Sequence, residues 1–347
     1  MKIALVTEHW FSRCPASDSA TTTVKAVADR FIDRGHEVRL VAPGPGLTRY
    51  RSSRIVRISP LAKPGAQVRD ALAELDPDLV HVTDPGRIGR RALKHADRMG
   101  LRTLVVQQSP VPRATEELWV SRVADRADKV LVTADWMRTA LGRLGVAAEL
   151  WRPGVDARAF TPALRDPWLH GKWARAASSQ PRVVVGYAGS LARRHDVRDL
   201  AQLAGVPGIR VVLIGDGGQR GWLADRLPGA KLVDPLGTGD LAIALASLDV
   251  LVHPGRSETC CHVLREAGAS GVPVVAPRSG GAAEVVRNLE TGLLYDPETP
   301  AALAEAVRSA AADPRRGLLG AAGRDVALER DWPTAVDELV DAQVTSR

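Results

Sequence analysis

Residues 250–277 read VLVHPGRSETCCHVLREAGASGVPVVAP and combine a strand, a loop, a helix and a second strand. The apolar runs at both ends have the length of buried parallel strands. A loop that runs from a strand into a helix directs backbone N–H groups outward, and the helix N-terminus there favours a phosphate. Glu258 lies in this loop, and Glu266 lies about two turns further on, on nearly the same helix face. The stretch predicts a β-α-β unit with an anion site and two carboxylates beside it.

The rest of the chain repeats this alternation of strand and helix. Short apolar runs at residues 2–6, 79–82 and 183–188 are typical of buried parallel strands, and segments with helical spacing separate them. This alternation predicts an α/β protein with doubly wound sheets. A chain of 347 residues exceeds what a single core usually supports, so we expect two domains.

Composition excludes several classes of protein. Aromatic residues make up only 4% of the chain, and its basic residues form no stripe, so we expect no nucleic-acid partner. The sequence turns polar after Val6 and has no run of about 18 apolar residues, which predicts a cytoplasmic protein without an export signal or membrane span. The net charge of +7 is compatible with peripheral contact with the inner face of a membrane.

Motifs for cofactors and metals are incomplete. Residues 215–221 read GDGGQRG and miss the dinucleotide fingerprint, because Arg220 stands where the third glycine belongs. His81 and Asp84 lie three residues apart at a strand end, where a capped strand and turn explain them better than a metal does. Three cysteines, two of them adjacent, give neither a disulfide framework nor metal-ligand spacing. We therefore expect no cofactor and no metal.

The stretch 250–277 and the glycines that follow it resemble the retaining glycosyltransferases of the GT-B fold, family four. The family signature is Glu, seven residues, Glu, a small-residue helix, Gly-x-Pro-Val-Val and a Gly-Gly turn, and it matches Glu258, Glu266, residues 271–275 and residues 280–281. The opening residues 6–8 and the segment 150–156 are most similar to actinobacterial α-mannosyltransferases that use GDP-mannose. For Glu258 and Glu266 the competing interpretation is a solvated loop acid and an ordinary exposed helix residue.

The resemblance implies two Rossmann-like, doubly wound domains that face each other across a cleft. The acceptor domain would comprise residues 1–165 and a C-terminal crossover helix, 332–347. The nucleotide-sugar donor domain would comprise residues 182–331. Residues 166–181 are polar and lack a clear period, which predicts a linker between the two.

The resemblance also assigns roles to residues of the second domain. It implies that Glu258 approaches the hydroxyls of the donor sugar, that Glu266 holds the ribose of the nucleotide, and that loop amides grip the diphosphate. The catalytic residues would be Glu258, Arg194 and His195. The donor-binding residues would be Gly189, Ser190, Arg193, Gly215, Asp216, Thr259, Cys260, Cys261, His262, Val263 and Glu266.

The chain departs from the family at the residues that clamp the diphosphate. The family places an arginine where Ser190 stands and a lysine where His195 stands. Arg193, Arg194 or a protonated His195 would then have to supply the positive charge. The alternatives are weak catalysis, an altered donor, or a protein that binds without reacting.

Acceptor contacts are expected from the first domain. Asp18 and Ser19 occupy the opening loop, where relatives place a glycine-containing acceptor loop, and Gln107 and Gln108 follow a strand near a region that is catalytic in relatives. A polar strand end before the Pro110 turn explains the two glutamines equally well.

The resulting prediction is a retaining glycosyltransferase that needs no metal. It would move a hexose, with mannose favoured, from a nucleoside diphosphate sugar to a lipid-linked or small-molecule acceptor, antibiotic precursors among them. The alternatives are a non-catalytic nucleotide-sugar-binding protein of the same fold and a nucleotide-sugar 2-epimerase. The sequence does not indicate the oligomeric state.

Overall fold

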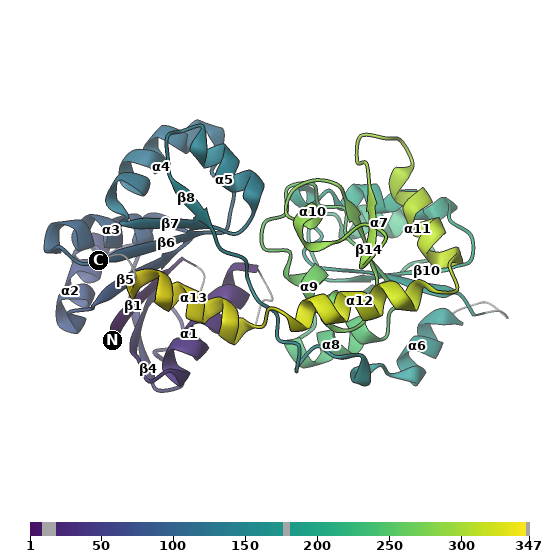
Figure 1. Ribbon diagram of the computed structural model, residues 1–347, viewed down its shortest axis with the longest axis horizontal. Helices are drawn as coiled ribbons and strands as arrows, with labels where there is room; N and C mark the ends of the chain where they lie inside the picture. The colour runs from purple at the N-terminus through teal and green to yellow at the C-terminus, as the bar shows by residue number, and fades with distance from the viewer. Residues whose placement is uncertain (9–18, 176–180, 345–347) are drawn as a thin grey trace. The chain divides into compact units, whose positions relative to one another are not determined.

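The structure is a computed structural model that describes residues 1–8, 19–175 and 181–344. Its internal contacts divide the chain into two compact units. Unit 1 comprises Met1–Pro153 and Trp332–Arg347, and unit 2 comprises Gly154–Asp331. Each unit is built around one twisted sheet with helices on both faces, which confirms the predicted doubly wound α/β architecture (Figure 1).

The sheet of unit 1 runs in the order β3-β4-β2-β1-β5-β6-β7-β8. Its strands pair in parallel, apart from β3 and β4, which are antiparallel. The strands are β1 (Lys2–Thr7), β2 (Glu37–Pro43), β3 (Arg49–Tyr50), β4 (Ser53–Ile58), β5 (Leu79–Thr83), β6 (Thr103–Gln107), β7 (Lys129–Val132) and β8 (Ala148–Leu150).

Helices cover both faces of this sheet. They are α1 (Ser19–Asp33), α2 (Pro64–Leu75), α3 (Arg87–Met99), α4 (Glu116–Arg122), α5 (Asp135–Gly142) and α13 (Trp332–Val344). Alternate residues of β1 serve the two faces, since Ala4 and Val6 lie in the core beneath α2, α3, α4 and α5, whereas Ile3 and Leu5 lie in the core beneath α1 and α13. This explains why β1 is apolar from Ile3 to Val6.

The C-terminal helix α13 belongs to unit 1, although residues 154–331 separate it from the rest of that unit. It packs against α1, where Arg30 Nε donates to Asp337 Oδ1 at 2.8 Å. The indole N–H of Trp151 donates to the carbonyl of Ala335 at 2.7 Å. The helix therefore completes the second face of the unit 1 sheet.

His81 is a fully buried imidazole on β5. Neither ring nitrogen has a hydrogen-bond partner among the described residues, and the ring packs edge-on against Phe31 at a centroid distance of 6.0 Å. Burial lowers the pKa of His81 to about 3, whereas histidine in an unfolded chain titrates near 6.5. Between these values the unfolded chain binds a proton that the folded chain does not, so unit 1 loses stability as the pH falls below about 6.5.

We expect His81→Leu to remove this dependence. The wild type should lose roughly 1.4 kcal/mol more unfolding free energy per pH unit than the variant between about pH 6 and 4. Urea unfolding of both proteins across this range measures the difference in slope. If the unfolding free energies of the two proteins changed equally with pH, His81 would be protonated in the folded state.

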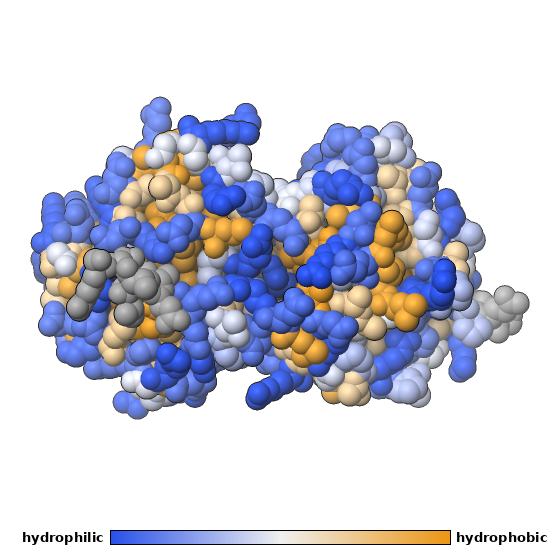
Figure 2. Space-filling model, in the orientation of Figure 1, coloured by the Kyte–Doolittle hydropathy of each residue, from blue (hydrophilic) through white to orange (hydrophobic). Residues whose placement is uncertain are grey.

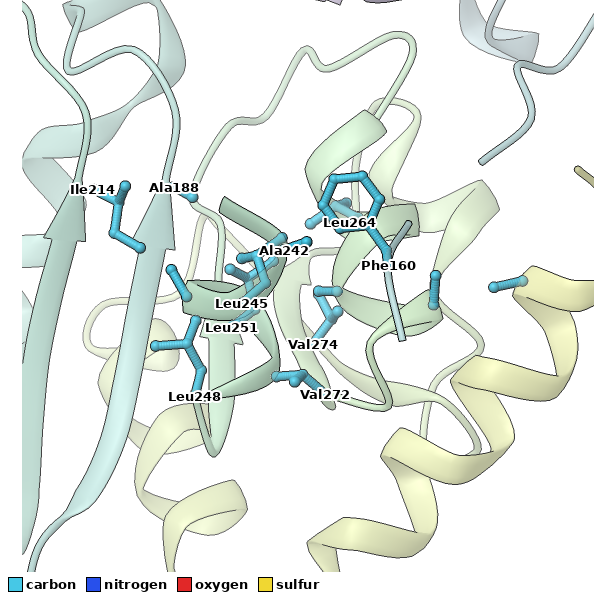
Figure 3. Close-up of a cluster of buried hydrophobic side chains, with 14 of the residues drawn as sticks. Phe160, Ala188, Ile214, Ala242, Leu245, Leu248, Leu251, Leu264, Val272 and Val274 are labelled. Atoms are coloured by element: carbon cyan, nitrogen blue, oxygen red, sulfur yellow. The ribbon is translucent and has the colours of Figure 1, made fainter. Parts of the chain in front are cut away.

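The sheet of unit 2 runs in the order β11-β10-β9-β12-β13-β14 and is parallel throughout. Its strands are β9 (Val183–Ala188), β10 (Ile209–Ile214), β11 (Lys231–Val233), β12 (Val250–Val252), β13 (Val274–Pro277) and β14 (Gly292–Tyr295). Its helices are α6 (Pro167–Ala174), α7 (Arg220–Arg226), α8 (Thr238–Ala246), α9 (His262–Ala269), α10 (Ala282–Val285), α11 (Ala302–Ala312) and α12 (Arg316–Leu328). Figure 3 shows the core on one face, where Leu245, Leu251 and Val274 lie together.

Residues 166–175, which belong to the segment predicted as a linker, instead fold onto unit 2. The carboxylate of Asp166 accepts hydrogen bonds from the N–H groups of Trp168 and Leu169 at 2.8 and 3.1 Å, and Pro167 occupies the first turn of α6. Both features favour the start of a helix. Trp173 near the end of α6 is buried in the unit 2 core. The unit boundary therefore falls after Pro153, earlier than the sequence led us to expect.

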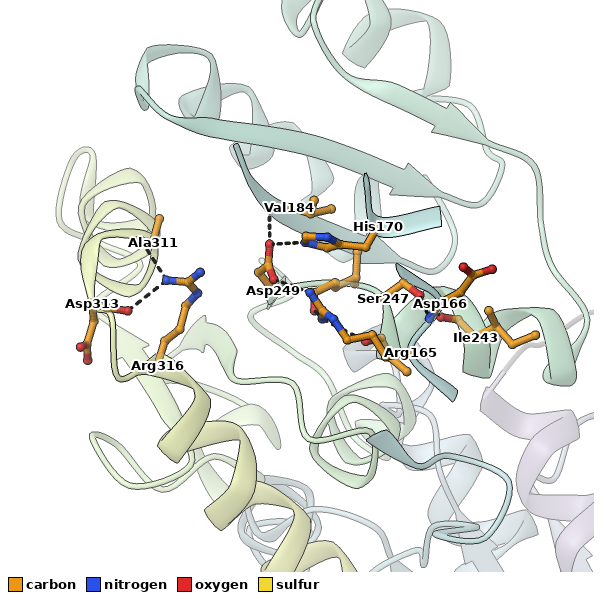
Figure 4. A network of polar contacts seen from close by, with 12 residues as sticks. Arg165, Asp166, His170, Val184, Ile243, Ser247, Asp249, Ala311, Asp313 and Arg316 are labelled. Carbon is orange, nitrogen blue, oxygen red and sulfur yellow. Dashed lines mark hydrogen bonds and ion pairs between the residues drawn. The ribbon is translucent and has the colours of Figure 1, made fainter. Parts of the chain in front are cut away.

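Asp249 anchors this segment at the amino ends of β9 and β12 (Figure 4). Its carboxylate accepts from Arg165 Nη2 at 2.9 Å and from the N–H of Val184 at 2.8 Å, and it lies 2.9 Å from His170 Nε2. Burial alone would raise the pKa of Asp249, but these hydrogen bonds outweigh it and lower the pKa. The carboxylate thus stays ionised and holds residues 165–170 on the sheet.

No helix within the described ranges is long and apolar enough to cross a membrane. The face of the molecule drawn in Figure 2 is largely hydrophilic, with smaller hydrophobic areas on both units.

Candidate functional site

The order of strands in unit 2 reverses between β9 and β12. The chain adds β10 and β11 on one side of β9 and then returns to add β12, β13 and β14 on the other side. Open α/β sheets bind ligands at the carboxyl ends of the strands at such a point. The segments after β9 and β12 contain most of the residues predicted to bind the donor, which makes this edge of the sheet the candidate site.

Two glycine turns meet at this edge. Gly189 follows β9 with φ +147°, and Gly215 follows β10 with φ +140°. A Cβ atom on Gly215 would stand 2.0 Å from the carbonyl oxygen of Gly189, so the two backbones approach as closely as only glycine permits. The N–H of Leu191 donates to the carbonyl of Asp216 at 2.8 Å. The structure therefore brings the predicted residues Gly189, Ser190, Gly215 and Asp216 together.

Glu258 is held beside two imidazoles. Its Oε1 lies 2.8 Å from His195 Nδ1 and 3.8 Å from His253 Nε2. Glu258 comes from the loop after β12 and His195 from the turn after β9. A second bond joins these segments, since the N–H of Arg256 donates to Asp196 Oδ2 at 2.9 Å. The two predicted catalytic residues Glu258 and His195 are thus direct partners.

The surroundings of Glu258 favour its ionised form. Burial alone would raise the pKa of Glu258, but His253 and His195 outweigh it and hold the pKa below its usual value. Burial lowers the pKa of His253, whose ring lies 5.6 Å from the ring of Tyr187 between centroids. The Tyr187 hydroxyl donates to the carbonyl of Ser190 at 2.9 Å. The result is an anionic Glu258 carboxylate that the imidazole rings of His253 and His195 stabilise.

The helix α9 begins directly after this carboxylate. Cys261 precedes it in the left-handed conformation, with φ 52°. Behind the loop, the N–H of Gly281 donates to the carbonyl of Glu258 at 2.7 Å, and a Cβ atom on Gly281 would stand 2.8 Å from the Thr259 carbonyl oxygen. The predicted Gly-Gly turn therefore supports the loop from behind. The remaining predicted donor contacts lie in this loop and the first turn of α9: Thr259, Cys260, Cys261, His262 and Val263.

Cys261 is not a candidate nucleophile. Its side chain is buried, and burial together with the charge of Glu258 raises the pKa of the thiol well above its usual value. A protonated thiol is a poor nucleophile.

Glu266 lies one turn after His262, so both side chains lie on the same face of α9. The Glu266 side chain is half-buried, and burial raises its pKa to about 7. At neutral pH this carboxyl is therefore able both to donate and to accept a hydrogen bond.

Positive charge at the edge comes from a short 3₁₀ turn, Arg193–His195. Arg193 and Arg194 are exposed, and neither side chain forms a hydrogen bond or ion pair with another residue that the structure describes. Arg256 differs, because its guanidinium is paired with Asp199 at 3.1 Å and Glu298 at 3.0 Å. Arg193 and Arg194 are thus the arginines here that remain available to an anionic ligand.

The predicted acceptor residues are less clearly placed. Asp18 lies outside the described residues, and Ser19 opens α1, with its side chain outside the description. Gln107 has an internal role, because its Oε1 accepts from the Trp119 indole at 3.0 Å and its Nε2 donates to the Ser109 carbonyl at 2.7 Å. Acceptor contact by these residues stays a prediction.

Asp84 fixes the loop that contains Gln108. Its Oδ1 accepts from the N–H groups of Gln108 and Ser109 at 2.7 and 2.8 Å. This supports the interpretation of Asp84 as a turn residue at the end of β5. Within the described ranges, no group of three or more His, Cys, Asp or Glu residues is arranged to hold a metal ion.

Sequence reasoning missed His253 and Tyr187 as parts of the site. His253 directly follows β12, at the same edge as the turn after β9, and this position was the signal that could have found it. Tyr187, within β9, packs against His253. The apolar sequence of β9 does not reveal which side chain of that strand meets a residue of another strand.

Comparisons with known proteins match both halves of the chain. A family model described as "Glycosyltransferase Family 4" matches residues 20–159, and one described as "Glycosyl transferases group 1" matches residues 182–313. A GDP-mannose-dependent alpha-mannosyltransferase from Mycolicibacterium smegmatis is 34% identical, with 98% of this chain and 96% of the relative covered.

Two further proteins are informative. A GDP-mannose-dependent alpha-(1-6)-phosphatidylinositol dimannoside mannosyltransferase from Mycobacterium tuberculosis is 28% identical over 87% of this chain and 86% of its own length. The structure of HepE from Anabaena, solved with UDP and glucose, superposes with a TM-score of 0.81 at 17% identity and covers 99% of this chain and 100% of its own. This chain has the GT-B fold and belongs to the family 4 glycosyltransferases.

Proposed function

We propose that this glycosyltransferase moves mannose from GDP-mannose to a lipid-linked acceptor with retention at the anomeric carbon. The sugar and the base come from the names of the relatives that match nearly the whole chain. The acceptor class is suggested by the phosphatidylinositol dimannoside mannosyltransferase. The observation that carries the proposal is the contact of 2.8 Å between Glu258 Oε1 and His195 Nδ1, at the point where the strand order reverses and α9 begins.

In this proposal the diphosphate binds at the N-terminus of α9. The helix dipole and the N–H groups of the loop favour an anion there, and Arg193, Arg194 and His195 add positive charge from the neighbouring turn. Glu258 approaches hydroxyls of the sugar. Glu266, further along α9, accepts hydrogen bonds from the ribose. No metal is required, because side chains and amides stabilise the departing diphosphate.

Retention follows if the acceptor attacks the same face of the sugar from which the diphosphate departs. An oxygen of the leaving phosphate then takes the proton of the acceptor hydroxyl, and the protein supplies no nucleophile. Its contribution is to orient both partners and to stabilise the charge that develops on the diphosphate.

The acceptor contacts are assigned to unit 1. Asp18, Ser19, Gln107 and Gln108 remain the candidates, with Gln107 positioned by Trp119. A lipid-linked acceptor implies an enzyme that works in the cytoplasm at the inner face of the membrane, where the net charge of +7 favours peripheral contact with anionic lipids.

We expect Arg194→Ala to lower kcat about a hundredfold, because it removes a cation that meets the charge of the departing diphosphate. Steady-state release of GDP measures the effect. Arg308→Ala is the matched control, since Arg308 is an exposed arginine on α11 of the same unit. Equal rates for the two variants would exclude Arg194 from the site.

A panel of nucleotide sugars tests the proposal as a whole. The purified protein is incubated with GDP-mannose, GDP-glucose, UDP-glucose or UDP-galactose, with and without phosphatidylinositol vesicles. Mannose transfer to lipid with release of GDP supports the proposal. Tight binding without turnover would indicate a non-catalytic binding protein. A product sugar of changed stereochemistry, with no acceptor consumed, would indicate an epimerase.

A further inference from the structure

We infer that His195 binds the donor diphosphate as an imidazolium with Glu258 as its counter-ion, so that donor binding takes up a proton from the solvent. The inference rests on the proposed function and adds a pH-dependent control of donor binding to it. It starts from the orientation of one ring, which the hydrogen bond to Glu258 sets.

The bond between His195 and Glu258 determines which ring nitrogen is left for a ligand. Since a carboxylate only accepts hydrogen bonds, Nδ1 of His195, 2.8 Å from Glu258 Oε1, must be the donor in that bond. The other ring nitrogen, Nε2, lies on the opposite side of the ring from this bond. In a neutral ring it would carry a lone pair, and in an imidazolium it carries a second N–H.

A diphosphate discriminates between these two forms. Its oxygens only accept hydrogen bonds, so a lone pair on Nε2 would repel them, whereas an N–H donates to them with the added attraction of opposite charge. Histidine ordinarily titrates near pH 6.5, within the range in which an enzyme works. Binding of the diphosphate therefore favours uptake of a proton by the ring.

The charged groups around His195 are mixed in sign. Its own turn supplies Arg193 and Arg194, and Asp196 follows directly. The segment 253–261 supplies Glu258 and the buried His253, and α9 supplies His262, whose charge also acts on Glu258. Tyr187 lies behind His253 and remains protonated, because burial raises its pKa. Among these groups, Glu258 is in direct contact with the ring and is the one that neutralises the imidazolium.

Isothermal titration calorimetry with GDP-mannose between pH 6 and 8.5 tests the inference. Both phosphates of this probe are esterified, so its own charge stays constant across the range. We expect the wild type to take up protons on binding the donor, read from the dependence of the enthalpy on the buffer, and to lose affinity with rising pH, by up to about tenfold per unit.

Three variants distinguish the effect of the charge on His195 from a structural effect of its replacement. His195→Lys should bind GDP-mannose with little change across this range and without proton uptake. His195→Gln should bind weakly at every pH. Glu258→Gln should shift the loss of affinity to lower pH, because the counter-ion is gone. Thermal unfolding of each variant shows whether it is folded.

His170→Gln provides a matched control. His170 also pairs with a carboxylate, Asp249, at 2.9 Å in the same unit, but at the opposite end of β9 (Figure 4). This variant should lose stability and keep the proton uptake. Binding of GDP-mannose by the wild type without proton uptake would overturn the inference and leave the proposed function standing. Absence of binding at every pH would remove both.

Discussion

Glu258→Gln is expected to lower kcat for mannose transfer about a hundred- to a thousandfold. The substitution keeps the shape of the side chain but removes the negative charge that lies beside His195 at 2.8 Å. It thereby weakens the hold on the imidazole and, in the proposed site, the contact with the sugar hydroxyls. Removal of one such preorganised group from a site of charge development typically has an effect of this size. Steady-state kinetics with saturating GDP-mannose and lipid acceptor measure it.

The control for this prediction is Glu290→Gln. Glu290 is an exposed glutamate in the same unit, and its carboxylate pairs with Arg287 at 2.9 Å, before the amino end of β14 and not at the carboxyl ends of β9 and β12. Its loss should change kcat less than twofold, since exposed ion pairs contribute about 0–1 kcal/mol. A similar kcat for Glu258→Gln and Glu290→Gln would remove Glu258 from the catalytic machinery.

Gly215→Ala should destabilise unit 2 by at least about 3 kcal/mol. The added Cβ would stand 2.0 Å from the Gly189 carbonyl oxygen, and φ is +140°, where residues other than glycine are strained. The two turns lie at the carboxyl ends of β9 and β10, where we propose that the donor binds. GDP-mannose binding should therefore be lost together with stability. Thermal unfolding should show a midpoint lower by about 6–12 °C for a domain of this size.

Gly218→Ala tests whether the effect depends on the close approach. Gly218 lies three residues further along the same turn, and a Cβ atom there meets nothing within 4 Å. We expect its stability to stay within about 0.5 kcal/mol of the wild type. If the two alanine variants unfold at the same temperature, the close approach of Gly215 to Gly189 does not stabilise unit 2.

The sequence was sufficient for features encoded locally. The stretch 250–277 contains its own strand, loop and helix, and the structure places β12, α9 and β13 there. The alternation of apolar strands with amphipathic helices similarly predicted two doubly wound sheets. Burial of both faces of a parallel sheet leaves this signature in each strand.

Features that depend on distant partners were not predictable. The α6 helix lies in a segment whose weak periodicity predicts a linker, and Asp249, far away in the sequence, holds it in place. The contact between His195 and Glu258 joins residues 63 positions apart, in segments that follow β9 and β12, two strands that become neighbours only when the sheet folds. His253 was overlooked for the same reason.

A crystal structure with GDP-mannose bound tests the central claim most directly. The account predicts the diphosphate at the N-terminus of α9, with a phosphate oxygen within hydrogen-bond distance of His195 Nε2 and the ribose beside Glu266. A nucleotide bound at the sheet of unit 1, or on unit 2 away from the carboxyl ends of β9 and β12, would contradict it.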